Sequence, residues 1–503
     1  MPVSFNQIPG SGLVDPIFAF EFNSAGLYSS VSRMVLIGHK TSAGTIAANT
    51  PTIVASQQDA DSLCGAGSML REMFRIVRQN APFQEVWVMH VAETGAAQTW
   101  TATVGSSAAG AAGTGTILIG GEVIQVPIAA TDTTTNIATS IATAINSYFN
   151  ALTGAMLPVT ATSSVAVVTI TARHLGAILA DLDFNIPTIS GNIFTAASAL
   201  TIASGTSGTG TPTLTTGLAA LGDDSWDFIV SPWGDSTSTG AYASTTNDTS
   251  GRWSYARQSY GHVWTQVTGN LSALTTAGGL LNDRHLSVIG RASNSVTPAY
   301  LWPAAIAARR ATWLSDYATG NVSRNATGST VLGLQGPRDR STWFGYANRN
   351  TLVQSGISTT INNIDGSVSI DKEVTTAQKG SSGQPDATFR DVQAMYQCMH
   401  VVRILRTDLL NAFGQKALAD SNPGNLPALV TPKDIASSLI TSYQKLALQG
   451  LVENLTGFTQ NLSVSRNASN TNRVDVYLPV QRVKPLDVLA VNATVFSGTI
   501  PSA

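Results

Sequence analysis

The chain has 503 residues, a formal net charge of -2 and only 12% charged residues, about half the usual share of roughly 25%. Its length predicts about three domains at roughly 150 residues each. The sparse charge argues against a nucleic-acid-binding surface built on broad positive charge and against a polybasic membrane tether.

Residues 1–30 are predicted to form an N-terminal arm. They contain the β-prone run Ile17–Phe22, with Phe18, Phe20 and Phe22. Such a run at a terminus is either an exposed edge strand or the first strand of the domain, and both readings stay open. The start of the chain, MPVSFNQIPGSG, lacks the charged and apolar regions of a signal peptide. No apolar run approaches the ~18 residues of a membrane-spanning helix, so we expect a soluble protein made in the cytoplasm.

Residues 31–94 and 217–336 are predicted to form one α/β core domain. Arg33–His39 has the pattern of a buried parallel strand, Ser56–Asn80 that of one long amphipathic helix, and Glu85–Val91 that of the next strand. The alternation resumes in the second part, with expected strands at Asp227–Ser231, His262–Gln266 and His285–Gly290 and expected helices at Thr249–Tyr260, Leu271–Asn282 and Ala299–Tyr317. Strands alternating with helices predict a mostly parallel sheet with helices on both faces.

Residues 95–216 are predicted to form a β-rich insert domain, with one helix, that interrupts this core. The insert is rich in Thr, Ala, Gly and Ser and almost free of charge. Its expected elements are a hairpin at Thr116–Ile119 and Val123–Ile128, a helix at Asn136–Phe149, and a strand pair at Val159–Thr162 and Ala166–Thr171. The flanks Thr94–Gly113 and Thr201–Gly217 are predicted to be linkers because Gly, Ser and Thr dominate them.

Residues 337–480 are predicted to form an α+β C-terminal domain that opens with a hairpin. Within Ser355–Thr376, an Asp-Gly pair separates two alternating runs, which is the strongest local signal for a β-hairpin. A long helix is expected over Asp391–Asn411. A second helix begins after Thr431, an N-cap residue followed by proline.

Two further alternating runs, Arg473–Val480 and Asp487–Phe496, end the chain. Residues 481–503 are predicted to form a C-terminal arm. β-prone runs at both termini favour assembly, since a strand supplied by one chain to another chain's sheet gives main-chain hydrogen bonds, and a repeated head-to-tail contact gives a ring or filament.

The sequence carries no catalytic or metal-binding motif: a P-loop, a dinucleotide-binding glycine motif, HExxH, CxxC and GxSxG are all missing. His39 and His90 end predicted parallel strands, where α/β active sites lie. A structural role is favoured for both, since neither a nucleophile nor a carboxylate motif accompanies them. Cys64 and Cys398 are predicted to be separate buried thiols. We therefore expect neither an enzyme nor a bound cofactor or metal.

The block Leu352–Thr376 (LVQSGISTTINNIDGSVSIDKEVTT) resembles the hairpin of contractile phage tail sheath proteins, and within them the Mu-like sheath family. Three further features are similar: the strand at Ile37-Gly38 with its long helix and EVWV strand, the insert ILIGGEVIQVPIAATDTTTNIATSIATAIN, and the ending RVDVYLPVQRVKPLDVLAVNATVF. The resemblance spans nearly the whole chain and is weakest over residues 1–30.

This resemblance implies a structural subunit that stacks in six-fold rings around a tail tube and contracts to drive the tube through the host envelope. The implied partners are copies of itself, the tail tube protein, the baseplate and the tail terminator, without direct nucleic-acid contact or membrane insertion. The implied location is the virion tail, after assembly in the host cytoplasm. Arms at both termini would join neighbouring subunits by strand addition, and the insert would project outwards.

On this chain the resemblance places inter-subunit strands in the N-terminal arm, the hairpin and the two C-terminal runs, and we expect the hairpin to belong to a small sheet that neighbours complete. The residues concerned are Phe18, Phe20, Phe22, Ile357, Val368, Ile370, Val374, Val474, Val476, Leu478, Leu489, Val491 and Val495. Which C-terminal strand is donated stays open. The alternatives are a tail tube or fibre protein and, less favoured, a cofactor-dependent α/β enzyme.

Overall fold

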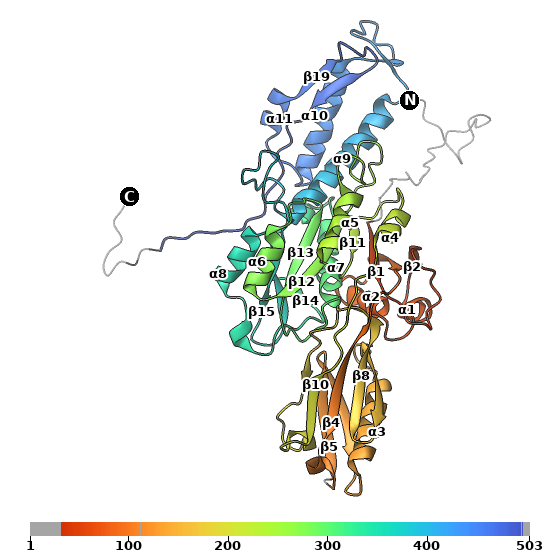
Figure 1. Ribbon diagram of the computed structural model, residues 1–503. Coiled ribbons are helices and arrows are strands. Elements are labelled where there is room, and N and C mark those ends of the chain that lie inside the picture. The colour runs from red at the N-terminus through yellow and green to blue at the C-terminus, as the bar shows by residue number, and fades with distance from the viewer. Residues whose placement is uncertain (1–31, 111, 494, 496–503) are drawn as a thin grey trace, which may run out of the picture. The chain divides into compact units, whose positions relative to one another are not determined.

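The computed structural model describes residues 32–110, 112–493 and 495, and a nine-stranded sheet forms its centre (Figure 1). The strands of this sheet are β1 (Arg33–Gly38), β2 (Thr52–Val54), β3 (Glu85–His90), β11 (Phe228–Val230), β12 (His262–Gly269), β13 (Leu286–Ala292), β14 (Thr330–Val331), β15 (Ile357–Asn362) and β16 (Val368–Lys372). Their order across the sheet is β14-β16-β15-β13-β12-β11-β1-β3-β2. The N-terminal run Ile17–Phe22 lies outside the described residues.

Most of the central sheet is parallel, as predicted. β1 pairs in parallel with β3 on one side and β11 on the other, and β12, β13 and β15 continue in the same direction. Consecutive residues of β1, from Met34 to Ile37, are all fully buried. Because consecutive side chains of a strand point to opposite faces, both faces of the sheet are covered. The helices around it include α6 (Leu271–Gly279), α7 (Leu301–Leu314) and α8 (Tyr346–Gln354).

The single helix predicted over Ser56–Asn80 is wrong, since the structure has two helices there. α1 (Gln57–Cys64) ends at Gly65, and α2 (Met69–Asn80) begins four residues later, after its own N-cap. Gly65 has φ 82°, and a Cβ there would lie 2.0 Å from the side-chain oxygen of Thr41. A residue with a side chain would be strained at this turn, so the glycine ends the helix.

A second prediction, the helix over Thr249–Tyr260, is also wrong. The helix lies earlier, as α5 (Ser236–Thr246), where the Asp235 carboxylate accepts backbone N–H groups of the first turn. Residues 249–260 instead form turns around buried Arg252, whose Nε donates to the carbonyl of Tyr260 at 2.7 Å. The buried guanidinium organises this loop through backbone carbonyls, which no hydrophobic period reveals.

The insert contains a four-stranded and a three-stranded sheet, in the orders β10-β4-β8-β7 and β6-β5-β9. Its elements are β4 (Ala97–Val104), β5 (Gly113–Ile119), β6 (Glu122–Ile128), α3 (Thr134–Asn146), β7 (Val159–Ser164), β8 (Val167–Leu175), β9 (Phe184–Asn185) and β10 (Leu200–Ser204). The flanks predicted to be linkers in fact contain β4 and β10, which pair antiparallel. Trp100, Ala102 and Val104 are buried, an alternation that the small Thr and Ala residues conceal in the sequence.

The hairpin β15–β16 belongs to the nine-stranded central sheet, so the expectation that it lies in a small sheet is wrong. β15 pairs with β13, β16 turns back beside β15, and β14 pairs with the outer edge of β16. The pairing of β13 with β15 joins segments about seventy residues apart, which local alternation does not reveal.

Beyond the hairpin lie α9 (Val392–Phe413), the two-residue strands β17 (Ala417–Leu418) and β18 (Leu429–Val430), α10 (Pro432–Leu448), α11 (Leu455–Asn461) and the antiparallel pair β19 (Ser463–Arg466) and β20 (Val474–Tyr477). The predicted Thr431 cap is confirmed: its hydroxyl accepts from the backbone of Asp434, whose carboxylate accepts from the backbone of Thr431. Within the described part of the chain, no helix is both long and apolar enough to span a membrane.

Candidate functional site

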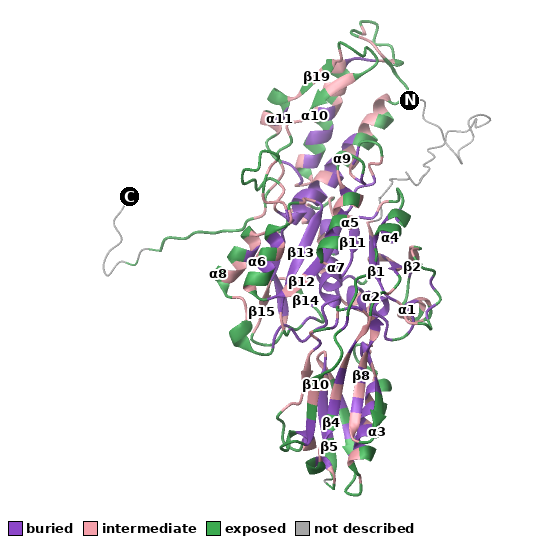
Figure 2. Cartoon of the chain, viewed as in Figure 1, coloured by how far each residue is buried: buried purple, intermediate pink, exposed green. Residues whose placement is uncertain are grey.

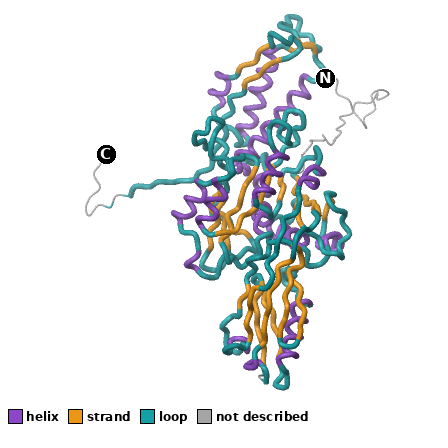
Figure 3. The backbone as a smooth tube through the Cα atoms, in the orientation of Figure 1, coloured by secondary structure: helices purple, strands orange, loops and turns teal. Residues whose placement is uncertain are grey.

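The C-terminal segment after β20 is the most exposed apolar stretch among the described residues. Residues 483–493 belong to no helix or strand (Figure 3) and carry green, exposed positions along their length (Figure 2). The exposed fractions are 78% for Leu489, 77% for Val491 and 93% for Val495. An extended apolar segment without a strand partner invites pairing with another chain.

The start of this segment, at Leu486 and Asp487, is fixed to its own chain by polar contacts. The ammonium of Lys372, at the end of β16, lies 2.7 Å and 2.8 Å from the two carboxylate oxygens of Asp487. The same ammonium lies 2.9 Å from Asp391, and the amide of Asn325 donates to the carbonyl of Leu486 at 2.6 Å. Residues beyond Asp487 therefore start from a defined point at the end of β16 in the central sheet.

The hairpin residues predicted to lie between subunits are covered by their own chain. Ile357, Val368 and Val374 are 0% exposed and Ile370 is 1% exposed. Their alternating pattern thus reflects packing inside this chain. A neighbouring subunit could reach the backbone at the edge of the sheet, but not these side chains.

The β19–β20 pair, unlike the hairpin, does not belong to a larger sheet. It is a two-stranded sheet that no third strand joins within the described residues. Val474 and Val476 are on β20, paired with Arg466 and Val464. Val476 is 39% exposed. Neither outer edge of this pair has a strand partner among the described residues. Leu478, just beyond β20, instead lines an apolar groove beside α9.

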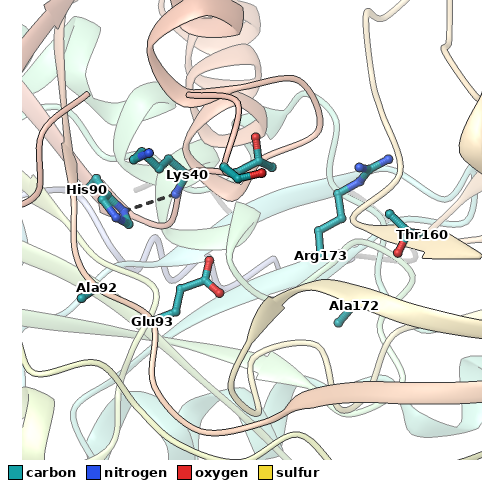
Figure 4. Close-up of a pocket in the computed structure, with 9 residues that line it drawn as sticks. Lys40, His90, Ala92, Glu93, Thr160, Ala172 and Arg173 are labelled. Atoms are coloured by element: carbon teal, nitrogen blue, oxygen red, sulfur yellow. Dashed lines mark hydrogen bonds between the residues drawn. The ribbon is translucent and has the colours of Figure 1, made fainter. Parts of the chain in front are cut away.

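A polar cleft of about 590 Å³ lies at the carboxyl ends of β1 and β3 (Figure 4). His90 is the last residue of β3, Lys40 and Glu93 come from the segments that follow β1 and β3, and Thr160 and Arg173 come from the insert. The sequence placed His90 at this edge. It could not show the insert residues, because only the fold brings β7 and β8 to the end of the sheet.

Histidines of this region are held by hydrogen bonds in ways that favour a structural role. The Nδ1 of His39 lies 3.0 Å from the carbonyl of Val91, and burial lowers the pKa of His39 to about 4. His174 lies 2.5 Å through Nδ1 from the Glu93 carboxylate, and its Nε2 accepts from the backbone of Met69 at 2.9 Å. With a pKa of about 4, His39 is a weak base, and both ring nitrogens of His174 are already held in hydrogen bonds, so neither ring is suited to act as a general base.

Neither the Cys64 thiol nor any cluster of acidic, histidine and cysteine side chains among the described residues provides a catalytic or metal site. Burial raises the pKa of the Cys64 thiol to about 12, so it stays protonated and is a poor nucleophile at neutral pH. In the part of the chain that the structure describes, no cluster of His, Cys, Asp and Glu side chains has the geometry to hold a metal ion.

Comparison with known proteins adds one consistent result. The family model for the phage tail sheath protein central domain matches residues 207–376, from before β11 to beyond β16. A tail sheath protein of the Mu-like prophage FluMu in Haemophilus influenzae is 27% identical over 486 residues, which are 95% of this chain and 96% of that protein.

Solved structures of sheath tail proteins are also similar to this chain. The protein of Desulfitobacterium hafniense gives a TM-score of 0.49 at 12% identity, over 93% of this chain and 97% of that one. The protein of Listeria innocua gives a TM-score of 0.47 at 13% identity, over 90% and 92% of the two chains.

Proposed function

We propose, because the chain belongs to the phage tail sheath family, that it polymerises as stacked six-fold rings around a tail tube and contracts to drive the tube through a host envelope. A sheath subunit is a structural protein and not an enzyme. Its proposed partners are further copies of itself, the tube protein, the baseplate and the tail terminator.

The observation that carries this proposal is the exposed C-terminal segment, together with a two-stranded sheet that no third described strand joins. We infer that residues 488–495 of one subunit add as a strand to the β19–β20 pair of a neighbour. β20 already pairs with β19 in its own chain, so we infer that β20 remains in its own subunit and is not donated. Backbone hydrogen bonds would supply affinity, and alternate apolar side chains would fix the register.

Such strand exchange explains how subunits could stay connected while the sheath contracts. A donated strand crosses from one folded unit to the next and is not released when the units rotate. The other contacts between subunits can then be replaced in a rigid-body rearrangement between two stable packings. An extended sheath that waits for a baseplate signal is held by a kinetic barrier.

The test compares three forms of the protein by negative-stain electron microscopy. Deletion of residues 487–503 and the substitution Val491→Asp should both leave a folded subunit that forms no sheath tubes. Asn492→Asp is the matched control, because it adds the same charge at the adjacent position, whose side chain points to the opposite face of an extended strand. We expect it to retain tubes.

Long, ordered tubes from the deletion variant would refute the donated strand. Elongated trimers in place of six-fold assemblies would indicate a fibre protein. Circular dichroism of each variant confirms that the subunit itself is folded, so a loss of tubes can be assigned to the arm.

A further inference from the structure

The polar cleft at β1 and β3 contains cations without carboxylate partners. Lys40 and Arg173 line it on opposite sides (Figure 4), and neither makes an ion pair within the described residues. The Lys40 ammonium donates to the carbonyl of Gly44 at 2.8 Å, and the Arg173 Nε donates to that of Leu157 at 2.9 Å. Both side chains are therefore held in place by carbonyl groups rather than by a salt bridge, although the Glu72 carboxylate favours the charged form of Arg173.

Arg173 is also partly removed from water. Its guanidinium packs on the turn before α2, where a Cβ at Gly67 would lie 3.0 Å from the Arg173 Nε. Burial lowers the pKa of Arg173, because a desolvated cation is less stable than a solvated one. An anion in the cleft would offset that cost and could accept from the guanidinium N–H groups that face away from Leu157.

The carboxylate of this cleft, Glu93, does not neutralise the two cations. One of its oxygens lies 2.5 Å from the His174 ring and the other accepts from the backbone of Leu175 at 3.0 Å. Although burial opposes the change, these hydrogen bonds lower the pKa of Glu93 and keep it ionised. The hydroxyl side chains of Thr41, Ser42 and Thr160 complete the lining.

The cleft lies beside the place where open α/β sheets usually bind ligands. The chain passes from β1 to β3 on one side and then returns to β11 on the other, so the carboxyl ends of β1 and β11 form the switch point at which such sheets bind ligands. At the switch point itself, His39 fills the space: its ring centre lies 4.9 Å from that of Trp233 and 5.6 Å from that of His174. The open cleft is displaced by one strand, towards β3.

We propose that this cleft binds a small phosphate-type oxyanion, either inorganic phosphate or the phosphate group of a monoester, between Lys40 and Arg173. A volume of about 590 Å³ accommodates such a ligand. Since Lys40 follows the central sheet and Arg173 belongs to the insert, the ligand bridges these two parts of the chain. The inference does not depend on sheath assembly.

The test is calorimetric titration of the full-length protein with sodium phosphate and with glycerol phosphate, each against sodium chloride of equal ionic strength. We expect saturable binding that Arg173→Gln and Lys40→Gln each weaken about tenfold or more, as expected for the loss of one charge-assisted hydrogen bond. Arg406→Gln is the matched control, because Arg406 is exposed on α9, away from the cleft, and makes no ion pair among the described residues. It should bind phosphate like the unmodified protein. A stronger signal with glycerol phosphate identifies a monoester as the ligand.

The absence of saturable binding, or equal binding by the cleft variants, would overturn the proposal and indicate adventitious ion binding only. Loss of tubes in the cleft variants without any phosphate binding would also overturn it, and would assign the cations to an acidic surface of a neighbouring subunit. If the variants do not fold, hydrogen exchange of the unmodified protein decides: phosphate must protect peptides containing Lys40 and Arg173. Tube formation is scored separately on the same samples.

Discussion

The buried ion pair between Arg310 on α7 and Glu373, the residue after β16, gives a sharp prediction about the hairpin. The two side chains are 1% and 3% exposed, and the Arg310 Nε donates to the Glu373 carboxylate. Glu373→Gln removes the charge but nearly keeps the shape, so it leaves a buried guanidinium without a counter-charge. We expect it to lower the free energy of unfolding by about 3–5 kcal/mol.

Its matched control is Glu85→Gln on the same sheet. Glu85 also pairs with an arginine, Arg33, at 3.1 Å, but the two side chains are 23% and 36% exposed. Water screens this pair, so its loss should cost only about 0–1 kcal/mol. The double variant Arg310→Met with Glu373→Leu removes both buried charges, and should recover most of the stability lost by Glu373→Gln.

Urea unfolding followed by tryptophan fluorescence and by circular dichroism measures these differences. The order expected is Glu373→Gln least stable, with the double variant and Glu85→Gln close to the unmodified protein. If Glu373→Gln were no more destabilising than Glu85→Gln, the pair would not be desolvated and the reasoning would fail.

Two further predictions concern acid and the break between α1 and α2. Burial lowers the pKa of His39 to about 4 and that of His262 to about 3, from 6.5, so the unfolded chain binds more protons below pH 6.5. The free energy of unfolding should therefore fall as pH drops from 6.5 to 4, by about 2 kcal/mol per histidine at pH 5. Urea unfolding of His262→Gln should show a smaller fall over the same pH range. An equal pH dependence in that variant would contradict the assignment. Gly65→Ala should lower the melting temperature, because its φ of 82° and the contact with Thr41 exclude a side chain. Gly279→Ala, which meets no atom within 4 Å, should leave it unchanged or raised, and equal effects of the two substitutions would refute the strain.

The sequence predicted elements whose signal is local and strong. β1, β3 and the Thr431 cap follow from continuous apolar runs and from capping chemistry, and each appears where expected. Predictions failed where backbone conformation or buried polar contacts, and not hydrophobic periodicity, determined the local structure. A positive φ at Gly65 divides one periodic helix in two, and carbonyls bound to Arg252 shape a loop where a helix was expected.

The same limit applies to the polar cleft. His39 and His90 could be placed at strand ends from their runs alone, because parallel strands bring their carboxyl ends to one edge. Arg173 and His174 could not, since they belong to an insert whose contact with that edge depends on the whole fold. An isolated arginine in a neutral segment was the only sequence signal available.

Alternation could not separate the strands that this chain keeps from those it is proposed to donate. Val368 and Ile370 alternate just as Leu489 and Val491 do, yet the first two are 0% and 1% exposed and the second two are 78% and 77% exposed. The difference lies in the partner, which is present in this chain for β16 and absent from it, within the described residues, for the C-terminal segment.

Lys372 connects β16, which this chain keeps, with the C-terminal segment that we propose it donates. It is the last residue of β16 and its ammonium also binds Asp487. If residues 488–495 pair with a neighbour, a pull on them reaches the central sheet through this ammonium and through the buried ion pair one residue further along. The hairpin that resembles sheath proteins would then act as the anchor of the exchanged strand. In that case the buried side chains of the hairpin would hold the anchor inside its own subunit, and the exposed apolar side chains beyond Asp487 would pack against the neighbouring subunit.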